Sequence, residues 1–251
     1  MLRKIKSKIM SLFDKHFWLK ILYYKFAVFC SNHRITPPLS SRSKRSEEIW
    51  AGQTKDGDKS PLHYVEMVDG IKLMFLDIIE HLNKNANILE IGCNAGASID
   101  YLYQQGYRNF TGIEIGLEAK RVMQEYFPDA FNTTEYIVGN ACDELKKLPA
   151  NYYDLVFAKA TLVNIAPKWN EMFKEMARVS RGYILTFERE GTITAYPRSF
   201  EKMLKKVGYK QIIYKHYNLT PDRKNKTLSP KYLKDEMFNT LILRIFVREE
   251  E

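Results

Sequence analysis

The amino-acid sequence predicts a doubly wound α/β fold, in which helices cover both faces of a mostly parallel seven-stranded sheet, with an N-terminal helical extension. Short apolar runs alternate with amphipathic stretches from residue 87 onward, which is the pattern of successive βαβ units. Residues 1–45 lack this alternation and carry eleven Lys or Arg residues against one acidic residue. A chain of 251 residues suffices for one such domain with an attached segment.

The basic N-terminal segment predicts an amphipathic helix. Apolar side chains recur at helical spacing over residues 2–29, and several lysines fall outside that stripe. We assign residues 1–33 to a basic amphipathic extension and residues 34–60 to a linker with one short helix near Trp50. Lys20 and Lys25 interrupt the longest apolar run, which is too short to cross a bilayer. No secretory signal is apparent, and the separate cysteines suit a reducing compartment, so a cytosolic protein is expected.

Residues 61–251 form the predicted domain. Its helices are expected at residues 60–83, 95–105, 117–126, 142–148, 168–179 and 198–207. Its strands are expected at residues 88–91, 110–114, 136–138, 153–158, 182–187, 210–215 and 240–247. The helices between parallel strands are short enough for right-handed crossovers. The three cysteines share no metal-ligand spacing, and we expect no metal.

The most informative segment joins the first strand to the next helix. Gly92 and Gly96 flank a turn that follows Glu90 at the carboxyl edge of the predicted sheet. Glycine has no Cβ, so the backbone can approach a ligand closely, and the free N–H groups of the next helix lie there too. Asn94 occupies the position of the middle glycine in dinucleotide-binding turns, which disfavours a pyrophosphate ligand. An ordinary tight turn between a strand and a helix is the alternative.

Two further polar residues follow later strands of the predicted sheet. Glu114 ends the second strand, 18 residues after Gly96, where a carboxylate can accept both hydroxyls of a ribose. Asn140 follows the third strand. Because the carboxyl ends of parallel strands meet at one edge, we expect both residues beside the glycine turn. An exposed acid that caps a helix is the alternative for Glu114.

These motifs resemble those of the class I S-adenosylmethionine-dependent methyltransferases. The first motif of that family has the form Asp/Glu-x-Gly-x-x-x-Gly, and its second strand ends in an acid. The segment at Asn140 resembles the family's adenine-contacting segment, with Asn where Asp is more usual. The resemblance covers roughly residues 60–216 and implies a Rossmann-like methyltransferase fold with S-adenosylmethionine as cofactor. The cofactor-binding residues that it implies are Glu90, Gly92, Cys93, Gly96, Glu114, Asn140 and Ala141.

Catalytic residues are expected on the acceptor side, after the fourth and fifth strands or before the first. Methyl transfer from a sulfonium needs alignment and, for a hydroxyl acceptor, a base. Asn164 lies where the family often has a histidine, but an amide cannot accept a proton at neutral pH, so it could only orient a substrate. His63 is the first candidate for the base and Glu188 the second. The alternative for Asn164 is a turn residue, and the alternative for His63 is a structural histidine. The alternative for Glu188 is a paired surface cluster over residues 188–190.

The expected function is methyl transfer to a small-molecule or glycan-like acceptor, at the inner face of a membrane if residues 1–33 bind anionic lipid. The same residues could instead pack on the catalytic domain. Residues 1–45 carry a net charge of +10, whereas the rest of the chain carries −1, so the folded body should attract nucleic acid weakly. An RNA methyltransferase with a basic arm and a non-catalytic cofactor-binding scaffold are the alternatives. The acceptor, the methylated atom and the oligomeric state stay open.

Overall fold

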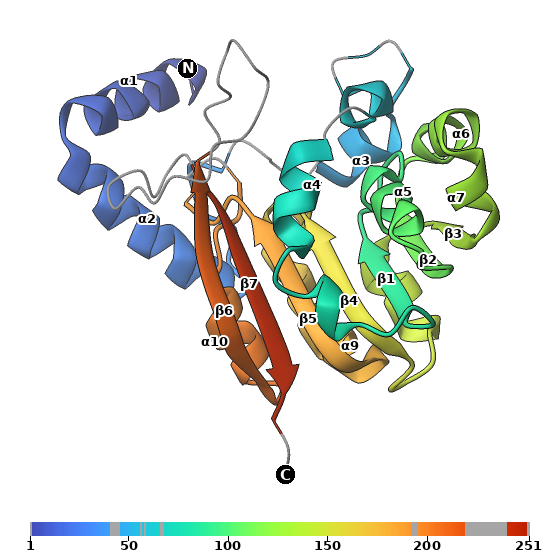
Figure 1. The fold of residues 1–251 in the computed structure, drawn as a ribbon. Helices are drawn as coiled ribbons and strands as arrows, with labels where there is room; N and C mark the ends of the chain where they lie inside the picture. The colour runs from blue at the N-terminus through green and yellow to red at the C-terminus, as the bar shows by residue number, and fades with distance from the viewer. Residues whose placement is uncertain are drawn as a thin grey trace.

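A seven-stranded sheet with helices on both faces forms the body of the protein (Figure 1). The computed structural model describes residues 2–40, 46–55, 57, 59–65, 68–191, 195–218 and 240–249. The strands are β1 (Asn87–Ile91), β2 (Asn109–Glu114), β3 (Thr134–Val138), β4 (Tyr153–Lys159), β5 (Ser180–Glu188), β6 (Tyr209–Asn218) and β7 (Thr240–Arg248). Their order in the sheet is β3-β2-β1-β4-β5-β7-β6, and only the pairings of β7 are antiparallel. The predicted fold is confirmed.

The order of the strands determines where a ligand can bind. The chain runs outward from β1 to β2 and β3, and then returns to place β4 on the other side of β1. The loops after β1 and β4 therefore leave the sheet in opposite directions, and a crevice opens between them. In open α/β sheets, ligands bind in this crevice at the carboxyl ends of the strands.

Helices occupy the segments between the strands. They are α1 (Leu2–Lys15), α2 (Phe17–Asn32), α3 (Ser46–Ala51), α4 (Val68–Phe75), α5 (Ala97–Gln104), α6 (Leu117–Tyr126), α7 (Pro128–Asn132), α8 (Ala141–Glu144), α9 (Met172–Val179) and α10 (Phe200–Lys205). Short 3-10 turns lie at Pro61–Tyr64, Ile79–His81, Leu145–Lys147, Leu162–Asn164 and Pro167–Trp169. The helix predicted over residues 60–83 is thus divided into two turns and α4, and α7 was not predicted.

The core consists of two apolar layers, one on each face of the sheet. Neighbouring residues of a strand point to opposite faces, so Ile88 packs with Phe75 of α4 in one layer, and Leu89 belongs to the other with Phe173 of α9. Burying such side chains on both faces stabilises the fold by about 1.5–3 kcal/mol each. The near-continuous apolar runs of the parallel strands follow from this double burial.

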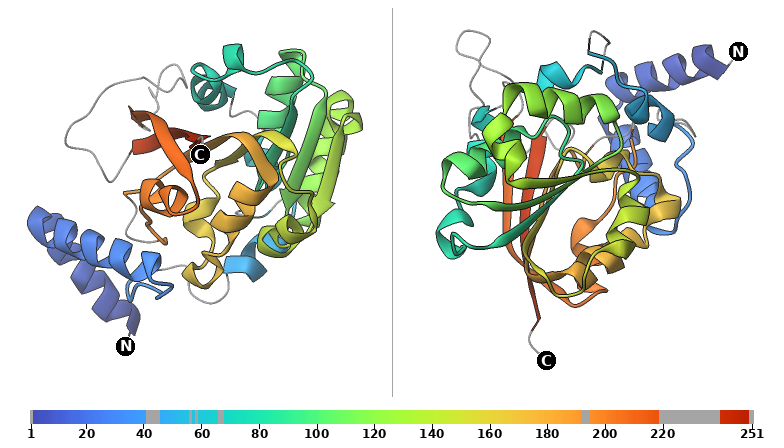
Figure 2. Two further views of the ribbon diagram at one scale, coloured as in Figure 1. Left: turned by 90° about the horizontal axis from the view of Figure 1, so that it is seen from below. Right: turned by 90° about the vertical axis from the view of Figure 1, so that its right-hand side faces the viewer.

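The N-terminal extension forms two helices, and the prediction of one continuous helix is wrong. The chain leaves helical geometry at His16, with φ −132°, and α1 and α2 then lie side by side, apart from the sheet (Figure 2). Phe13 stacks on Tyr23 with ring centroids 5.4 Å apart, so apolar side chains of the predicted stripe bury one another. Among the described residues, no helix is both long and apolar enough to span a membrane.

Candidate active site

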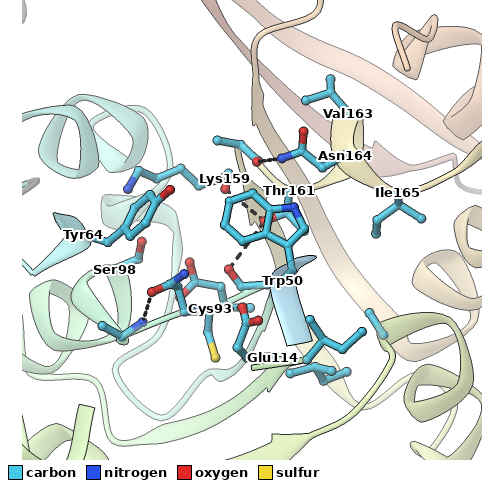
Figure 3. A pocket seen from close by; sticks show the side chains of 18 of the residues that line it. Trp50, Tyr64, Cys93, Ser98, Glu114, Lys159, Thr161, Val163, Asn164 and Ile165 are labelled. Atoms are coloured by element: carbon cyan, nitrogen blue, oxygen red, sulfur yellow. Dashed lines mark hydrogen bonds between the residues drawn. The ribbon is translucent and has the colours of Figure 1, made fainter. Parts of the chain in front are cut away.

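A cavity of about 520 Å³ lies at the carboxyl ends of the parallel strands (Figure 3). One wall follows β1, β2 and β3, and it includes six of the seven residues predicted to bind the cofactor. The opposite wall follows β4 and includes Lys159, Ala160, Thr161, Val163, Asn164 and Ile165. We call residues 161–165 the acceptor loop. The crevice expected from the strand order is therefore a real cavity, and it joins the two predicted halves of the site.

The two glycines of the first turn have different roles. Gly92 lines the cavity with φ +74°, and a side chain there would collide with Thr161 of the acceptor loop. Gly96, with φ +76°, does not line the cavity, and a side chain there would collide with Met123 of α6. The absence of a Cβ at Gly96 therefore serves the packing of α6 against this turn. Gly92 and Cys93 both line the cavity, so the close approach of the backbone to a ligand stays a prediction for Gly92.

Glu114 is held at the cavity by the backbone. Its Oε1 accepts a hydrogen bond from the N–H of Gly116 at 2.9 Å, and its Oε2 accepts one from Asn94 at 3.1 Å. Burial raises the pKa of this carboxyl, and these backbone hydrogen bonds act against the increase. Because Glu114 is buried, the alternative of an exposed helix cap is wrong. A carboxylate oxygen can accept a second hydrogen bond, so both oxygens remain able to bind a hydroxyl in the cavity.

Glu90 and Lys159 form an ionisable pair between the two walls of the cavity. Burial raises the pKa of Glu90 to about 8, and Lys159 and a hydrogen bond from Ser98 act against the increase. Burial lowers the pKa of Lys159, and Glu90 acts against the decrease. Within the described part of the chain, Glu90 Oε2 has no hydrogen-bond partner. The side chain of Lys159 extends toward Tyr64, which covers this end of the cavity (Figure 3).

The predicted residues after the third strand also line the cavity. The side-chain Oδ1 of Asn140 accepts a hydrogen bond from the N–H of Cys142 at 2.9 Å and so caps α8. Ala141 begins that helix and contributes to the same wall. An aspartate would cap the helix equally well, so the Asn at this position preserves the local backbone.

The acceptor side contains one of the three predicted catalytic residues. Asn164 lines the cavity, and its Nδ2 donates a hydrogen bond to the carbonyl of Ala160 at 2.7 Å. His63 is exposed in the Pro61–Tyr64 turn and does not line the cavity, whereas the next residue, Tyr64, does. Glu188 does not line it either.

Glu188 lies behind the acceptor loop, where its carboxylate binds the backbone. It is fully buried and accepts hydrogen bonds from the N–H groups of Thr161, Leu162 and Val163 at 2.9, 2.8 and 3.4 Å. Glu190 is buried as well and makes a bidentate ion pair with Arg244. The predicted surface cluster over residues 188–190 is therefore wrong, because both of its acids are inside the protein.

Arg198 holds the same loop from its carbonyl side. This fully buried guanidinium donates to the carbonyls of Leu162 at 2.8 Å and Ile165 at 2.5 Å, and to Oδ1 of Asn170 at 2.8 Å. Asn170 in turn donates to the carbonyl of Ser31 in α2 at 2.7 Å. Sequence reasoning missed Arg198, because nothing in its local sequence indicates that an arginine between a proline and a serine is buried.

The predicted linker forms the cover of the cavity. Trp50 of α3 lines it, and Glu47 of the same helix accepts a hydrogen bond from Nε1 of Trp169 at 2.7 Å. Gln53 is buried against Gly116, where a Cβ would lie 2.7 Å from its Oε1. The short helix near Trp50 was predicted, but its contact with the active site was not. The only sequence signal was an apolar Ile-Trp pair within a polar segment.

Comparisons with known proteins agree with this geometry. Residues 89–185 match the family model described as a methyltransferase domain. No curated protein sequence matches the chain.

Among solved structures, the chain is similar in fold to a chain from a complex of a Haloferax volcanii methyltransferase activator with a methyltransferase. The two chains are 13% identical with a TM-score of 0.62, and the match covers 81% of this chain and 98% of that chain. It is also similar to a TehB-like methyltransferase from Corynebacterium glutamicum, with 15% identity and a TM-score of 0.53. That match covers 73% of this chain and 89% of the Corynebacterium chain. A third similar structure is the magnesium protoporphyrin IX methyltransferase of Synechocystis, crystallised with S-adenosylmethionine. It is 16% identical to this chain with a TM-score of 0.51, and the match covers 75% of this chain and 81% of that chain.

The matched domain spans β1 to β5, which includes the glycine turn, Glu114 and the acceptor loop. The chain shares its fold with these solved structures. Residues 89–185 therefore form a methyltransferase domain, and the chain has the fold of S-adenosylmethionine-dependent methyltransferases.

Proposed function

We propose that the chain transfers a methyl group from S-adenosylmethionine, bound along the ends of β1, β2 and β3, to a small-molecule or glycan-like acceptor at the β4 side of the cavity. The observation that carries the proposal is the arrangement of the cavity walls. Six predicted cofactor residues form one wall, and the acceptor loop with Lys159 forms the other. A cofactor on the first wall would present its methyl group to the second.

The residues of the first wall suit the chemical groups of this cofactor. Glu90 Oε2 is a buried acceptor without a hydrogen-bond partner in the described residues, so it can receive the ammonium group of the methionine part. The carboxylate of Glu114 can receive the ribose hydroxyls. Gly92 leaves the backbone accessible, and Asn140 and Ala141 lie where the adenine is expected.

The cofactor supplies a methyl group that is already activated for in-line displacement. The protein must align the acceptor, exclude water and, for a hydroxyl acceptor, remove a proton. Trp50 and Tyr64 cover the cavity and exclude water, and Asn164 offers its amide for orienting the acceptor. Lys159 replaces His63 and Glu188 as the proposed base, because it lines the cavity and burial lowers its pKa toward the range of a working base.

The test is incubation of the purified protein with isotopically labelled S-adenosylmethionine and cell extract, followed by mass spectrometry. We expect a labelled small molecule or glycan fragment. Lys159→Met should lower turnover at saturating cofactor by ~10²–10⁴, whereas His63→Ala should be neutral. Label in RNA alone would favour the RNA alternative, and cofactor binding without any labelled product would favour the scaffold.

We further propose that α2 brings the enzyme to an anionic membrane surface. Trp18, Leu22 and Phe29 of this helix are 63%, 60% and 54% exposed. They recur at i, i+4 and i+11, so they share one face of the helix. The N-terminal residues 1–45, which contain them, carry the net positive charge of the chain. RNA would be attracted by the charge alone and has no use for the apolar face.

Co-sedimentation with vesicles tests the membrane contact. Binding should require anionic lipid, weaken with salt, and be lost in a Trp18→Ser, Leu22→Ser double variant that keeps its cofactor affinity. If the double variant binds vesicles as the wild type does, the apolar face of α2 has another role.

A further inference from the structure

A second, smaller cavity separates α2 from α10. This groove of about 270 Å³ lies between the exposed side of α2 and the catalytic domain, and no residue lines both it and the active-site cavity. Its lining residues are Lys25, Val28, Phe29, Asn32, His33, Lys202, Met203 and Lys206. The groove is therefore built jointly by the extension and by α10 with the residue that follows it.

The charge of the groove is entirely positive. Three lysines line it, and none of the described residues that line it is acidic. None of the three ammonium groups makes an ion pair with another described residue. Lys202 lies in α10, and Lys206 caps the C-terminus of this helix four residues later, so their like charges repel. An anion between Lys25 of α2 and these two lysines would relieve that repulsion.

The groove also has apolar lining residues, and one of them lies on the exposed face of α2. Val28, Phe29 and Met203 contribute the apolar atoms. Phe29 also belongs to the exposed row that contains Trp18 and Leu22, and Lys25 falls on the same helical face. A ligand that fits this surface combines an anionic head with an apolar body, and the head lies at the level of the lysines.

We infer that the groove binds the phosphate of an anionic phospholipid headgroup, while the aromatic and aliphatic side chains of α2 enter the boundary with the acyl chains. The inference rests on the proposed membrane contact of α2 and adds to it a specific headgroup site. Lys202 and Lys206 belong to the catalytic domain, so the site would fix the domain, and not only the extension, against the membrane. The Lys25 ammonium would approach the same phosphate from α2.

The test compares neutralising substitutions on one helix. Lys202→Gln and Lys206→Gln remove charges that line the groove, and Lys205→Gln removes an exposed charge of α10 that does not. The probe is a vesicle of equal parts phosphatidylcholine and phosphatidylglycerol, with pure phosphatidylcholine vesicles and inorganic phosphate as separate arms. Calorimetry with S-adenosylhomocysteine verifies that each variant is folded.

A headgroup site predicts that Lys202→Gln and Lys206→Gln each weaken binding to the anionic vesicles about fivefold, and Lys205→Gln much less. Equal losses in all three variants would mean that only diffuse charge attracts the membrane, and the groove inference would be wrong while the membrane contact stood. No binding of the wild type to anionic vesicles would overturn both. If inorganic phosphate stabilises the wild type but the groove variants bind vesicles normally, the groove takes a free phosphate and the lipid assignment fails.

Discussion

Glu114 illustrates how a single carboxylate is prepared for a ligand. Two backbone N–H groups orient it and leave its remaining lone pairs toward the cavity. Glu114→Ala should weaken the binding of S-adenosylhomocysteine by about 1–3 kcal/mol, the scale for losing a charge-assisted hydrogen-bonding partner. Calorimetry measures the change, and Glu118→Ala on the neighbouring helix, which removes an acid outside the cavity, is the matched control. Equal affinity of Glu114→Ala and wild type would place the ribose elsewhere.

The raised pKa of Glu90 gives a pH dependence to cofactor binding. In the free protein this pKa is about 8, so much of the carboxyl is protonated at neutral pH. A positively charged cofactor beside it favours the carboxylate and lowers the pKa, so binding releases a proton. Affinity should therefore rise as the pH increases toward about 8 and level off above it.

Calorimetry in buffers of different ionisation enthalpy counts the released proton. Glu90→Gln should abolish both the release and the rise in affinity below the plateau. A pH profile identical in wild type and variant would show that Glu90 does not face the cofactor.

The residues of the first cavity wall could be brought together from the sequence because each follows a strand that the sequence reveals. Gly92, Glu114 and Asn140 come directly after apolar runs, and parallel topology then brings them together. His63 was misplaced by one residue, since only the geometry of the Pro61–Tyr64 turn decides that Tyr64 faces the cavity. Glu188 and Arg198 were missed as structural residues because their partners are distant in sequence, such as Thr161 and Leu162.

At the level of elements, the acceptor loop is the segment whose position depends most on buried charge. Glu188 binds its N–H groups and Arg198 binds its carbonyls. Arg198→Ala should lower the free energy of unfolding by about 3–5 kcal/mol, because it leaves the carbonyls of Leu162 and Ile165 and Oδ1 of Asn170 without their donor, at about 1–3 kcal/mol for each buried group. Thermal or denaturant unfolding measures the loss.

A milder change tests the positioning role without unfolding the protein. Asn170→Ala removes one support of Arg198 and the bond to Ser31, and it lies outside the cavity wall. Hydrogen exchange should become faster at the amides of residues 161–163, whereas β1 should exchange as in the wild type. Uniform exchange across the domain, or unchanged exchange in the loop, would contradict this link between α2 and the loop.

Some helices and strands can be identified from the periodicity of apolar residues in the sequence, whereas the ends of others depend on tertiary contacts. All seven strands were predicted within a few residues, because their double burial produces apolar runs. The helix over residues 60–83 was not continuous, and α1 and α2 were taken as one, because both breaks depend on tertiary packing. Phe13 on Tyr23 is an example, since the two rings meet only once the chain has turned at His16.

At the scale of the whole molecule, the two N-terminal helices differ in their attachment to the domain. α1 contacts α2, whereas α2 supplies Ser31 to Asn170 and Asn32 to the N–H of Ser199 at 3.2 Å. Deleting residues 1–16 should therefore leave the melting temperature and cofactor affinity nearly unchanged. Deleting residues 1–33 should lower the melting temperature by several degrees, because it also removes the buried Ala27 and Cys30. Equal melting temperatures of the two truncations would mean that α2 is not a part of the folded body.

The measurement that tests the central claim most directly is a calorimetric titration of the full chain with S-adenosylhomocysteine. The cavity between the glycine turn and the acceptor loop predicts one binding site per chain, with affinity reduced in Glu114→Ala and retained in His63→Ala. An absence of binding heat at several temperatures, with a folded wild-type protein, would contradict the assignment of this cavity to the cofactor.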